Sequence, residues 1–88
     1  MSVKIEDEKI VVDLGGSEAF LKYHVKKDKM YIDATFTPEE HRGKGIGAKM
    51  MEAAINYARE KKLKIVPVCP FSVEFFKKHP EYKNMLAG

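Results

Sequence analysis

The segment best suited to chemistry is Arg42-Gly43-Lys44-Gly45-Ile46-Gly47, which has glycine at three alternate positions. It stands directly before a run with helical periodicity. Glycine lacks the Cβ that would hold a ligand away from the backbone, and it adopts positive φ easily. Successive N–H groups in such a loop can point at one anion, and the following helix dipole strengthens the attraction. Arg42 and Lys44 add positive charge, and an arginine can bind phosphate through two hydrogen bonds. The loop therefore predicts binding of a phosphate-bearing ligand.

Two better-known phosphate loops do not fit this segment, and a simple turn is the remaining alternative. The spacing G-x-G-x-G departs from the dinucleotide-binding pattern, and no acidic residue follows a second strand at the right distance. No Gly-Lys-Ser/Thr closes the loop, which excludes the nucleotide P-loop. A tight strand-to-helix turn needs only one or two glycines. Three of them flanked by Arg and Lys favour anion binding.

Cys69 is the second candidate for chemistry, because it stands between a predicted strand and a predicted helix. A helix N-terminus favours the thiolate and can make such a cysteine nucleophilic. The alternative is a buried cysteine that packs as a small hydrophobic residue, the commoner role of a lone cysteine. As the only cysteine of the sequence, it excludes an internal disulfide and an all-cysteine metal site.

The elements that must position these residues are four strands and two helices. Alternating apolar residues, turn residues and prolines predict the strands, and Pro67 suggests that the last is an edge strand or is locally broken. A helix is predicted over Gly45–Lys61, with one apolar stripe, and a second over Phe71–His79, with its phenylalanines turned inward. A last turn is expected over Tyr82–Leu86. The four predicted strands are Lys9–Leu14, Ala19–Lys26, Met30–Phe36 and Lys64–Val68.

The order strand-strand-strand-helix-strand-helix predicts an α+β fold with a mixed, mostly antiparallel sheet and two main helices. With 88 residues, the chain is expected to form a single minimal domain over residues 1–88. Sixteen basic and 13 acidic side chains are scattered along it, which argues against nucleic-acid binding. No segment reaches the roughly 20 apolar residues of a membrane span, and the charged N-terminus does not look like a signal peptide. These features predict a soluble, cytoplasmic protein.

The segment from Phe36 to Ala48 resembles the acetyl-coenzyme A signature of the GNAT acetyltransferases, Arg/Gln-x-x-Gly-x-Gly/Ala, with Arg42, Gly45 and Gly47 at its fixed positions. The resemblance implies that amides of this loop hold the coenzyme A pyrophosphate. It also implies that the end of the preceding strand pairs with the pantetheine arm. The implied cofactor-binding residues are Thr35, Phe36, Thr37, His41, Arg42, Gly43, Lys44, Gly45, Ile46, Gly47 and Ala48.

A second family pattern, Asn-x-x-Ala-x-x-x-Tyr, places Cys69, Ser72 and Phe76 at its fixed positions. The chain is similar to a short-form branch of the family that has a cysteine at this place, so the resemblance implies a catalytic role for Cys69. The departures are that the acceptor-binding parts of longer members are missing and that Phe76 replaces the tyrosine that protonates the leaving thiolate. The resemblance implies acetyl transfer from acetyl-coenzyme A to an amine, the acceptor being a small molecule or a protein.

Several alternatives stay open. Direct transfer would need a base, for which the candidates are Glu39, Glu40, His41 and His79. The alternatives are ordinary surface charge for the two glutamates, which is the favoured explanation of both, a place beside the phosphates for His41 and a helix cap for His79. A non-catalytic coenzyme A-binding or sensor module, or a small interaction domain, would use the same chain without turnover. No histidines or acids stand at metal-ligand spacing, so no metal is expected. The protein is expected to be a monomer or a weak dimer, since a sheet edge could remain uncovered.

Overall fold

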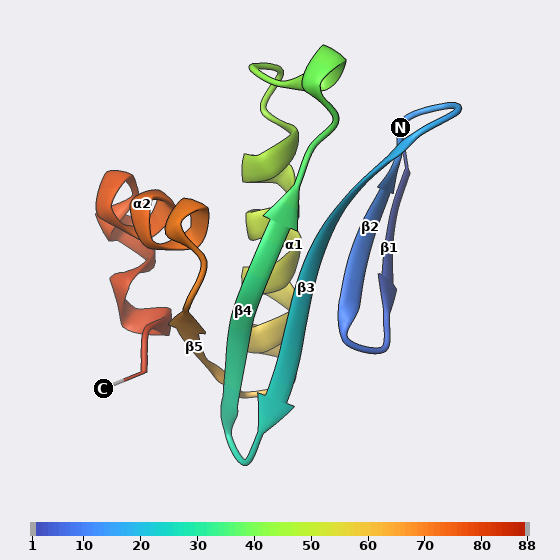
Figure 1. The fold of residues 1–88 in the computed structure, drawn as a ribbon. Helices are drawn as coiled ribbons and strands as arrows, with labels where there is room; N and C mark the ends of the chain where they lie inside the picture. The colour runs from blue at the N-terminus through green and yellow to red at the C-terminus, as the bar shows by residue number, and fades with distance from the viewer. Residues whose placement is uncertain (1, 88) are drawn as a thin grey trace.

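The chain folds into a five-stranded sheet with one long helix across one face (Figure 1). The computed structural model describes residues 2–87. The strands follow one another across the sheet in chain order; the first four pair antiparallel, and β4 pairs with β5 in parallel. The strands are β1 (Ser2–Glu6), β2 (Lys9–Asp13), β3 (Glu18–Lys26), β4 (Lys29–Phe36) and β5 (Lys64–Pro67).

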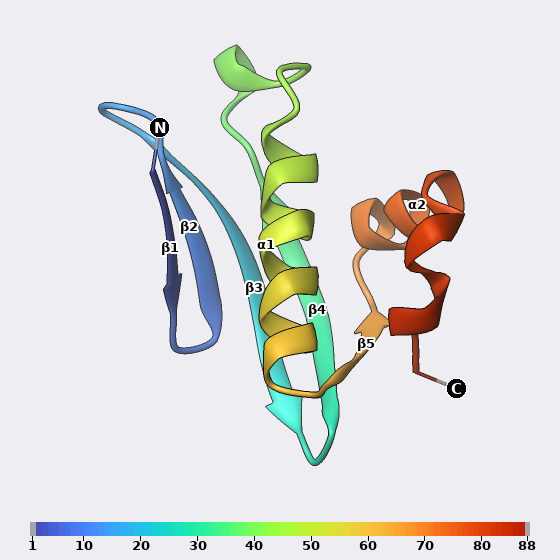
Figure 2. The ribbon, with the colours of Figure 1, turned by 180° about the vertical axis from the view of Figure 1, so that it is seen from behind.

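Helix α1 (Ile46–Glu60) connects β4 to β5 and covers one face of the sheet, as Figure 2 shows from behind. Two neighbouring parallel strands need such a crossover connection. The apolar stripe predicted from the sequence is the buried face of the helix: Ile46, Met50, Met51, Ala54, Ile55 and Ala58. It packs against inward residues of β2, β3 and β4, among them Ile10, Leu21 and Ile32. The predicted α+β fold with a mostly antiparallel sheet is therefore confirmed.

Helix α2 (Pro70–Lys78) and the 3-10 helix η2 (Pro80–Met85) pack beyond β5. Phe75 and Phe76 are buried there, as the sequence predicts. Phe71 was predicted to face inward as well, and this is wrong, since 42% of it is exposed. Pro70 begins the helix, so Phe71 lies in a first turn that reaches toward the N-terminus of α1 rather than over the sheet.

The sequence patterns missed one strand and placed the others correctly to within a residue or two. β1 was not predicted, because its five residues are all exposed and most are polar or charged. The β3–β4 hairpin forms without glycine, and Lys27 takes a φ of 58° in its two-residue turn. β5 lies at the edge of the sheet, as Pro67 suggested, and Pro67 is its last residue.

Two irregularities of β4 prepare the site. Lys22 pairs with Ala34 whereas Tyr23 pairs with Ile32, so Asp33 is an extra residue on β4 and forms a β-bulge. The pairing of β4 with β5 ends at Ile32, although β4 continues to Phe36. Beyond Ile32 the two parallel strands separate. The last part of β4 therefore keeps one edge free of β5.

Candidate functional site

A groove of about 460 Å³ opens beside this free edge of β4 and the N-terminus of α1. It is hereafter called the glycine groove. It brings together the end of β4, the loop after it, the first turn of α1 and one side chain of α2. Its lining residues are Thr35, Phe36, Thr37, His41, Arg42, Gly43, Gly45, Gly47, Ala48 and Phe71. Nine of the eleven residues that the resemblance implied for cofactor binding thus line this one groove.

The backbone of the loop is shaped by two glycines at positive φ. Gly43 has a φ of 81° and Gly45 a φ of 80°, values that other residues adopt at a cost. A Cβ added at either position would meet nothing within 4 Å, so open space lies above this backbone. Gly45 caps α1 without a side chain, and the first turn carries no acidic residue. The first N–H groups of α1 are therefore not bound by an acidic residue of the helix's own first turn and can bind an anion from solution.

Arg42 is held at the mouth of the groove by its own loop. Its Nε donates a hydrogen bond to the Thr37 carbonyl oxygen at 3.0 Å, which closes the segment between the two residues. The short 3-10 helix η1 (Glu39–His41) fills that segment. Since Nε is used in this way, the terminal nitrogens of the guanidinium are left to bind phosphate oxygens.

Cys69 lies where β4 and β5 separate. The Ile32 carbonyl oxygen accepts hydrogen bonds from the N–H groups of Val68 (3.0 Å) and Cys69 (3.1 Å), which fixes the start of α2 to β4. Cys69 caps α2, and its Sγ accepts the Ser72 N–H at 3.4 Å. The Thr35 hydroxyl oxygen is 4.0 Å from this sulfur. Cys69 is buried, with 7% exposed, so the thiol is a wall residue near the groove and not an open surface group.

Ser72 supports Cys69 from the next turn of the helix. Its hydroxyl donates to the Cys69 carbonyl oxygen at 2.8 Å and lies 3.3 Å from Sγ, and the residue is fully buried. The sulfur thus has three polar neighbours: the Ser72 N–H, the Ser72 hydroxyl and, farther away, the Thr35 hydroxyl. The Ser72 N–H donates to the sulfur and would stabilise negative charge on it, whereas the Ser72 hydroxyl donates its proton to the Cys69 carbonyl oxygen.

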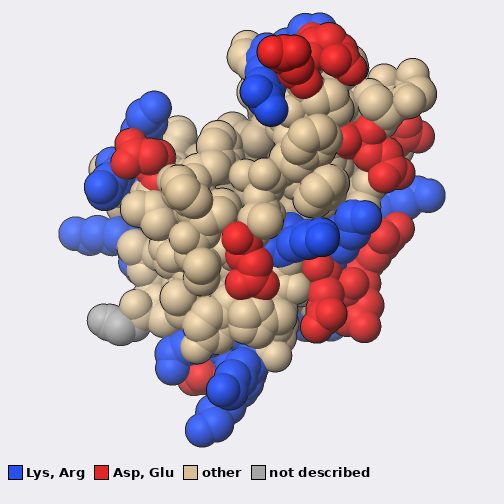
Figure 3. Space-filling model, viewed as in Figure 1, with Lys and Arg blue, Asp and Glu red and all other residues tan. Residues whose placement is uncertain are grey.

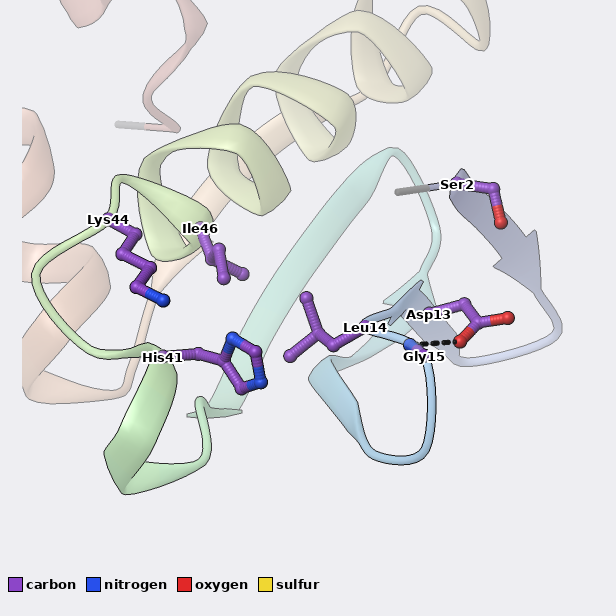
Figure 4. A pocket seen from close by; sticks show the side chains of 7 residues that line it. All are labelled: Ser2, Asp13, Leu14, Gly15, His41, Lys44 and Ile46. Atoms are coloured by element: carbon purple, nitrogen blue, oxygen red, sulfur yellow. Dashed lines mark hydrogen bonds between the residues drawn. The ribbon is translucent and has the colours of Figure 1, made fainter.

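Lys44 and Ile46 do not line the glycine groove. With His41 they border a second, open cavity of about 540 Å³, whose other lining residues are Ser2 and, at the end of β2, Asp13, Leu14 and Gly15 (Figure 4). Ile46 is buried in the core, so only its backbone N–H is available to a ligand in the groove. His41 borders both cavities. The loop pattern alone could not separate Lys44 from its neighbours, because the direction of each side chain depends on the folded backbone.

Of the four candidate bases, only His41 borders the groove. Glu39 and Glu40 lie on η1, outside the lining residues. His79 ends α2; its Nδ1 is 3.3 Å from Glu81 Oε2, and its ring lies tilted against Phe75 with 4.3 Å between the ring centroids. A backbone hydrogen bond and the nearby His79 lower the pKa of the Glu81 carboxyl. His24, on the uncovered face, is hydrogen-bonded to Asp33 at 2.7 Å and takes no part in the groove.

Phe71 is the groove residue that sequence reasoning missed. A Cβ on Gly47 would come within 2.5 Å of the Phe71 Cζ, so the aromatic ring lies directly on this glycine. Two elements far apart in the chain, α1 and α2, are thus in contact at the groove. The sequence held one weak signal for it: a third glycine, Gly47, that a turn does not need, and a phenylalanine directly after Pro70 at the start of α2.

Three further observations concern the surface charge, metal ligands and membrane-spanning helices. On the uncovered sheet face, basic and acidic side chains are interspersed around a broad uncharged area (Figure 3). Within residues 2–87, no group of three His, Cys, Asp or Glu side chains is placed to hold a metal ion. Among these same residues, no helix has the length and apolar character needed to cross a membrane.

The family model of the GCN5-related N-acetyltransferases matches residues 9–85, which is most of the chain. A solved structure with the same fold is the NMR solution structure of a GCN5-like protein from Staphylococcus aureus, proposed to be an N-acetyltransferase. The two chains are 29% identical and superpose with a TM-score of 0.80, over 99% of this chain and 88% of that one. No match was found among curated protein sequences. The chain belongs to the GCN5-related N-acetyltransferase family.

Proposed function

We propose that the protein transfers an acetyl group from acetyl-coenzyme A to an amine. One observation carries the proposal: the uncapped N-terminus of α1, Arg42 and the free edge of β4 border a single groove. A long ligand with a pyrophosphate at one point and an amide-containing arm beyond it matches these two kinds of binding surface. The fit is supported by the open space above Gly43 and Gly45, where any side chain would stand between ligand and backbone.

Each part of the groove has its own task in this proposal. The first N–H groups of α1 and the Arg42 guanidinium bind the pyrophosphate. The backbone of Thr35–Thr37, which β5 leaves unpaired, holds the pantetheine arm by strand-like hydrogen bonds. Acetyl-coenzyme A supplies a thioester as the acyl donor. The arm leads toward Cys69, which stands at the point of strand separation.

Cys69 can act in the transfer as a nucleophile. Its thiolate attacks the thioester carbonyl, a bond forms between Sγ and the acetyl carbon, and coenzyme A leaves as its thiolate. The amine then attacks the acetyl-cysteine, the C–N bond forms, the C–S bond breaks, and the ammonium proton passes to the Cys69 sulfur. The Ser72 N–H stabilises the sulfur when it carries charge. In a direct transfer the same sulfur would only border the reacting thioester.

A second function is favoured by a specific observation, the burial of Phe76. This residue takes the place of a phenol that could protonate the departing thiolate, and it is packed in the core with 6% exposed. A chain that binds coenzyme A without turnover, as a sensor or adaptor, needs no such acid. Product formation separates the two functions, because only the enzyme releases free coenzyme A and an acetylated amine.

The deciding experiment is a titration of acetyl-coenzyme A into the protein, followed by amide NMR shifts and by product analysis with amine acceptors. We expect saturable shifts within residues 35–48 and around Cys69. R42A should weaken binding by about tenfold, the value of a charge-assisted hydrogen bond pair. R59A removes an arginine from the far end of α1 and should bind as the parent does. Saturation without acetylated product would favour the sensor, and no saturation at all would reject both functions.

A further inference from the structure

The two edges of the sheet are treated differently. At the β5 edge, the C-terminal segment forms a parallel bridge between Leu86 and Ile65, and the Ala87 N–H donates to the Ile65 carbonyl at 2.9 Å. At the other edge, β1 pairs only with β2 among residues 2–87, and all five of its residues are exposed. An unpaired edge offers a row of N–H and C=O groups to another strand.

The two sides of β1 carry different chemistry. Val3 and Ile5 stand opposite Val12 and Ile10, which are fully buried under α1. They therefore point to the helix-bearing face, yet they are 38% and 47% exposed, since β1 lies beyond the flank of the helix (Figure 2). Lys4 and the next charged residue, Glu6, alternate with them and point to the opposite face. β1 thus has an unfinished apolar face and a charged face.

The charged face is complementary to itself. When two copies of β1 pair antiparallel about a two-fold axis at Ile5, Lys4 stands opposite the partner's Glu6 and Glu6 opposite the partner's Lys4. The same register places Ile5 beside the partner's Ile5 on the apolar side. An axis at Lys4 would instead put two lysines directly opposite each other, which is unfavourable. An axis at Val3 would pair Lys4 with the partner's Ser2 and leave Glu6 unpaired.

We propose that two copies of the chain associate through β1 in the Ile5-centred register and form one continuous sheet. Both copies then carry α1 on the same face, because residues of the same parity face each other. Ile5 and Val3 lose exposed apolar area, and two cross-strand ion pairs form on the other face. The contact is small, so the dimer is weak and depends on concentration. The glycine groove lies at the β4 side of the sheet and stays open in both copies.

The test is sedimentation velocity over a range of protein concentrations, with charge variants of exposed residues. K4E and E6K each place like charges opposite each other and should weaken self-association at least about tenfold. The double variant K4E/E6K exchanges the two charges and should dimerise as the parent does. An equimolar mixture of K4E and E6K should associate more strongly than either variant alone. K83E, which changes a lysine on η2, should have no effect.

The outcomes are decisive in both directions. Loss in the single variants with recovery in the double variant and in the mixture would establish the register. A parent chain that stays monomeric at millimolar concentration overturns the proposal, and so does self-association that K4E and E6K leave unchanged. Circular dichroism of each variant checks the fold, which should not change because Lys4 and Glu6 are exposed.

Discussion

Gly47 is the glycine of the loop whose role the structure makes most specific. Its backbone is helical, so any residue could adopt its conformation, whereas Gly43 and Gly45 need their positive φ. What Gly47 provides is space for the Phe71 ring. The sequence predicted the three glycines as one phosphate-binding unit. The structure separates them into two that shape the backbone and one that lets α2 approach α1.

The variant G47A tests this reading. The added methyl would stand 2.5 Å from the end of the Phe71 ring, and that ring is exposed enough to turn away. We therefore expect the ring to move into the glycine groove and acetyl-coenzyme A to bind about tenfold more weakly, as judged by calorimetric titration. The free energy of unfolding should change little, because alanine favours the helix over glycine by about 0.5–1 kcal/mol and this gain offsets the cost of displacing the ring.

The control is the double variant G47A/F71A. Removing the ring removes the obstacle, so the double variant should bind more tightly than G47A, and the two changes should be strongly non-additive. Additive losses would mean that the methyl itself, and not the displaced ring, meets the ligand.

The place of Cys69 before a helix predicted a chemical role for it, whereas the groups around its sulfur could not be predicted from the sequence. If the thiolate carries the acetyl group, C69A should lose at least about 100-fold in turnover and keep its affinity for acetyl-coenzyme A. The parent incubated with acetyl-coenzyme A should gain the mass of one acetyl group, which C69A should not. Turnover of C69A within a few-fold of the parent would show that transfer is direct. Loss of the cap should cost about 1 kcal/mol of stability, so assays belong well below the melting temperature.

At the scale of elements, α1 ends in a C-terminal cap that the apolar pattern of the sequence does not predict. The Leu63 N–H donates to the Ala58 carbonyl at 2.7 Å and the Lys62 N–H to the Arg59 carbonyl at 3.2 Å. This is the Schellman arrangement, in which the residue after the cap takes a left-handed conformation that usually falls to glycine. Here Lys62 takes it, with a φ of 60°.

The variant K62G should therefore stabilise the protein. Glycine removes the cost of a left-handed side chain, partly offset by its greater freedom in the unfolded chain, for a net gain of about 0.5–1 kcal/mol. The melting temperature should rise by a few degrees. K61G, one residue earlier, is the matched control and should destabilise, because Lys61 has a φ of −89° that suits any residue. A lower melting temperature for K62G would contradict the assignment of strain.

Elements whose residues alternate between a buried and an exposed side could be predicted, and β1 could not. The periods of β3, β4 and α1 reflect faces that meet a core, and the apolar run Ile10-Val11-Val12 of β2 is buried throughout, which is why the bounds of these elements were found closely. β1 alternates too, with Val3 and Ile5 between polar or charged residues, yet all five of its residues are exposed. The same holds for the glycine groove. Its backbone part could be predicted from the glycines of the loop, whereas the position of Phe71 in its wall depends on a tertiary contact between α1 and α2.

At the scale of the whole molecule, Tyr23 joins three parts of the fold. Its hydroxyl donates to the Glu6 carbonyl at 2.9 Å at the end of the β1–β2 hairpin, and its ring lies against Tyr57 of α1. The side chain itself stands on β3 and is buried, with 5% exposed. The phenol thus adds a side-chain hydrogen bond between β3 and the β1–β2 hairpin, which the β2–β3 ladder already joins to the sheet.

Burial, followed by the hydrogen bond with Tyr57, raises the pKa of Tyr23 from its ordinary value near 10 to about 12. The unfolded chain therefore ionises this phenol first. The contribution of the neutral phenol to the free energy of unfolding is complete below pH 10 and is lost as the pH rises toward 12. The loss is about 1 kcal/mol near pH 11 and on the order of 2–3 kcal/mol above pH 12. Urea unfolding between pH 8 and 11.5 should show this decline.

The variant Y23F separates this contribution from other alkaline effects. It leaves the Glu6 carbonyl without its partner, so we expect it to be about 1 kcal/mol less stable than the parent at pH 8. Since phenylalanine does not ionise, its stability should fall less steeply, and the two curves should converge near pH 11. Ultraviolet titration of the folded parent should show a tyrosinate transition near pH 12 that Y23F lacks. Parallel stability curves would mean that the hairpin is held to the sheet by its β2 ladder and that the phenol adds only packing.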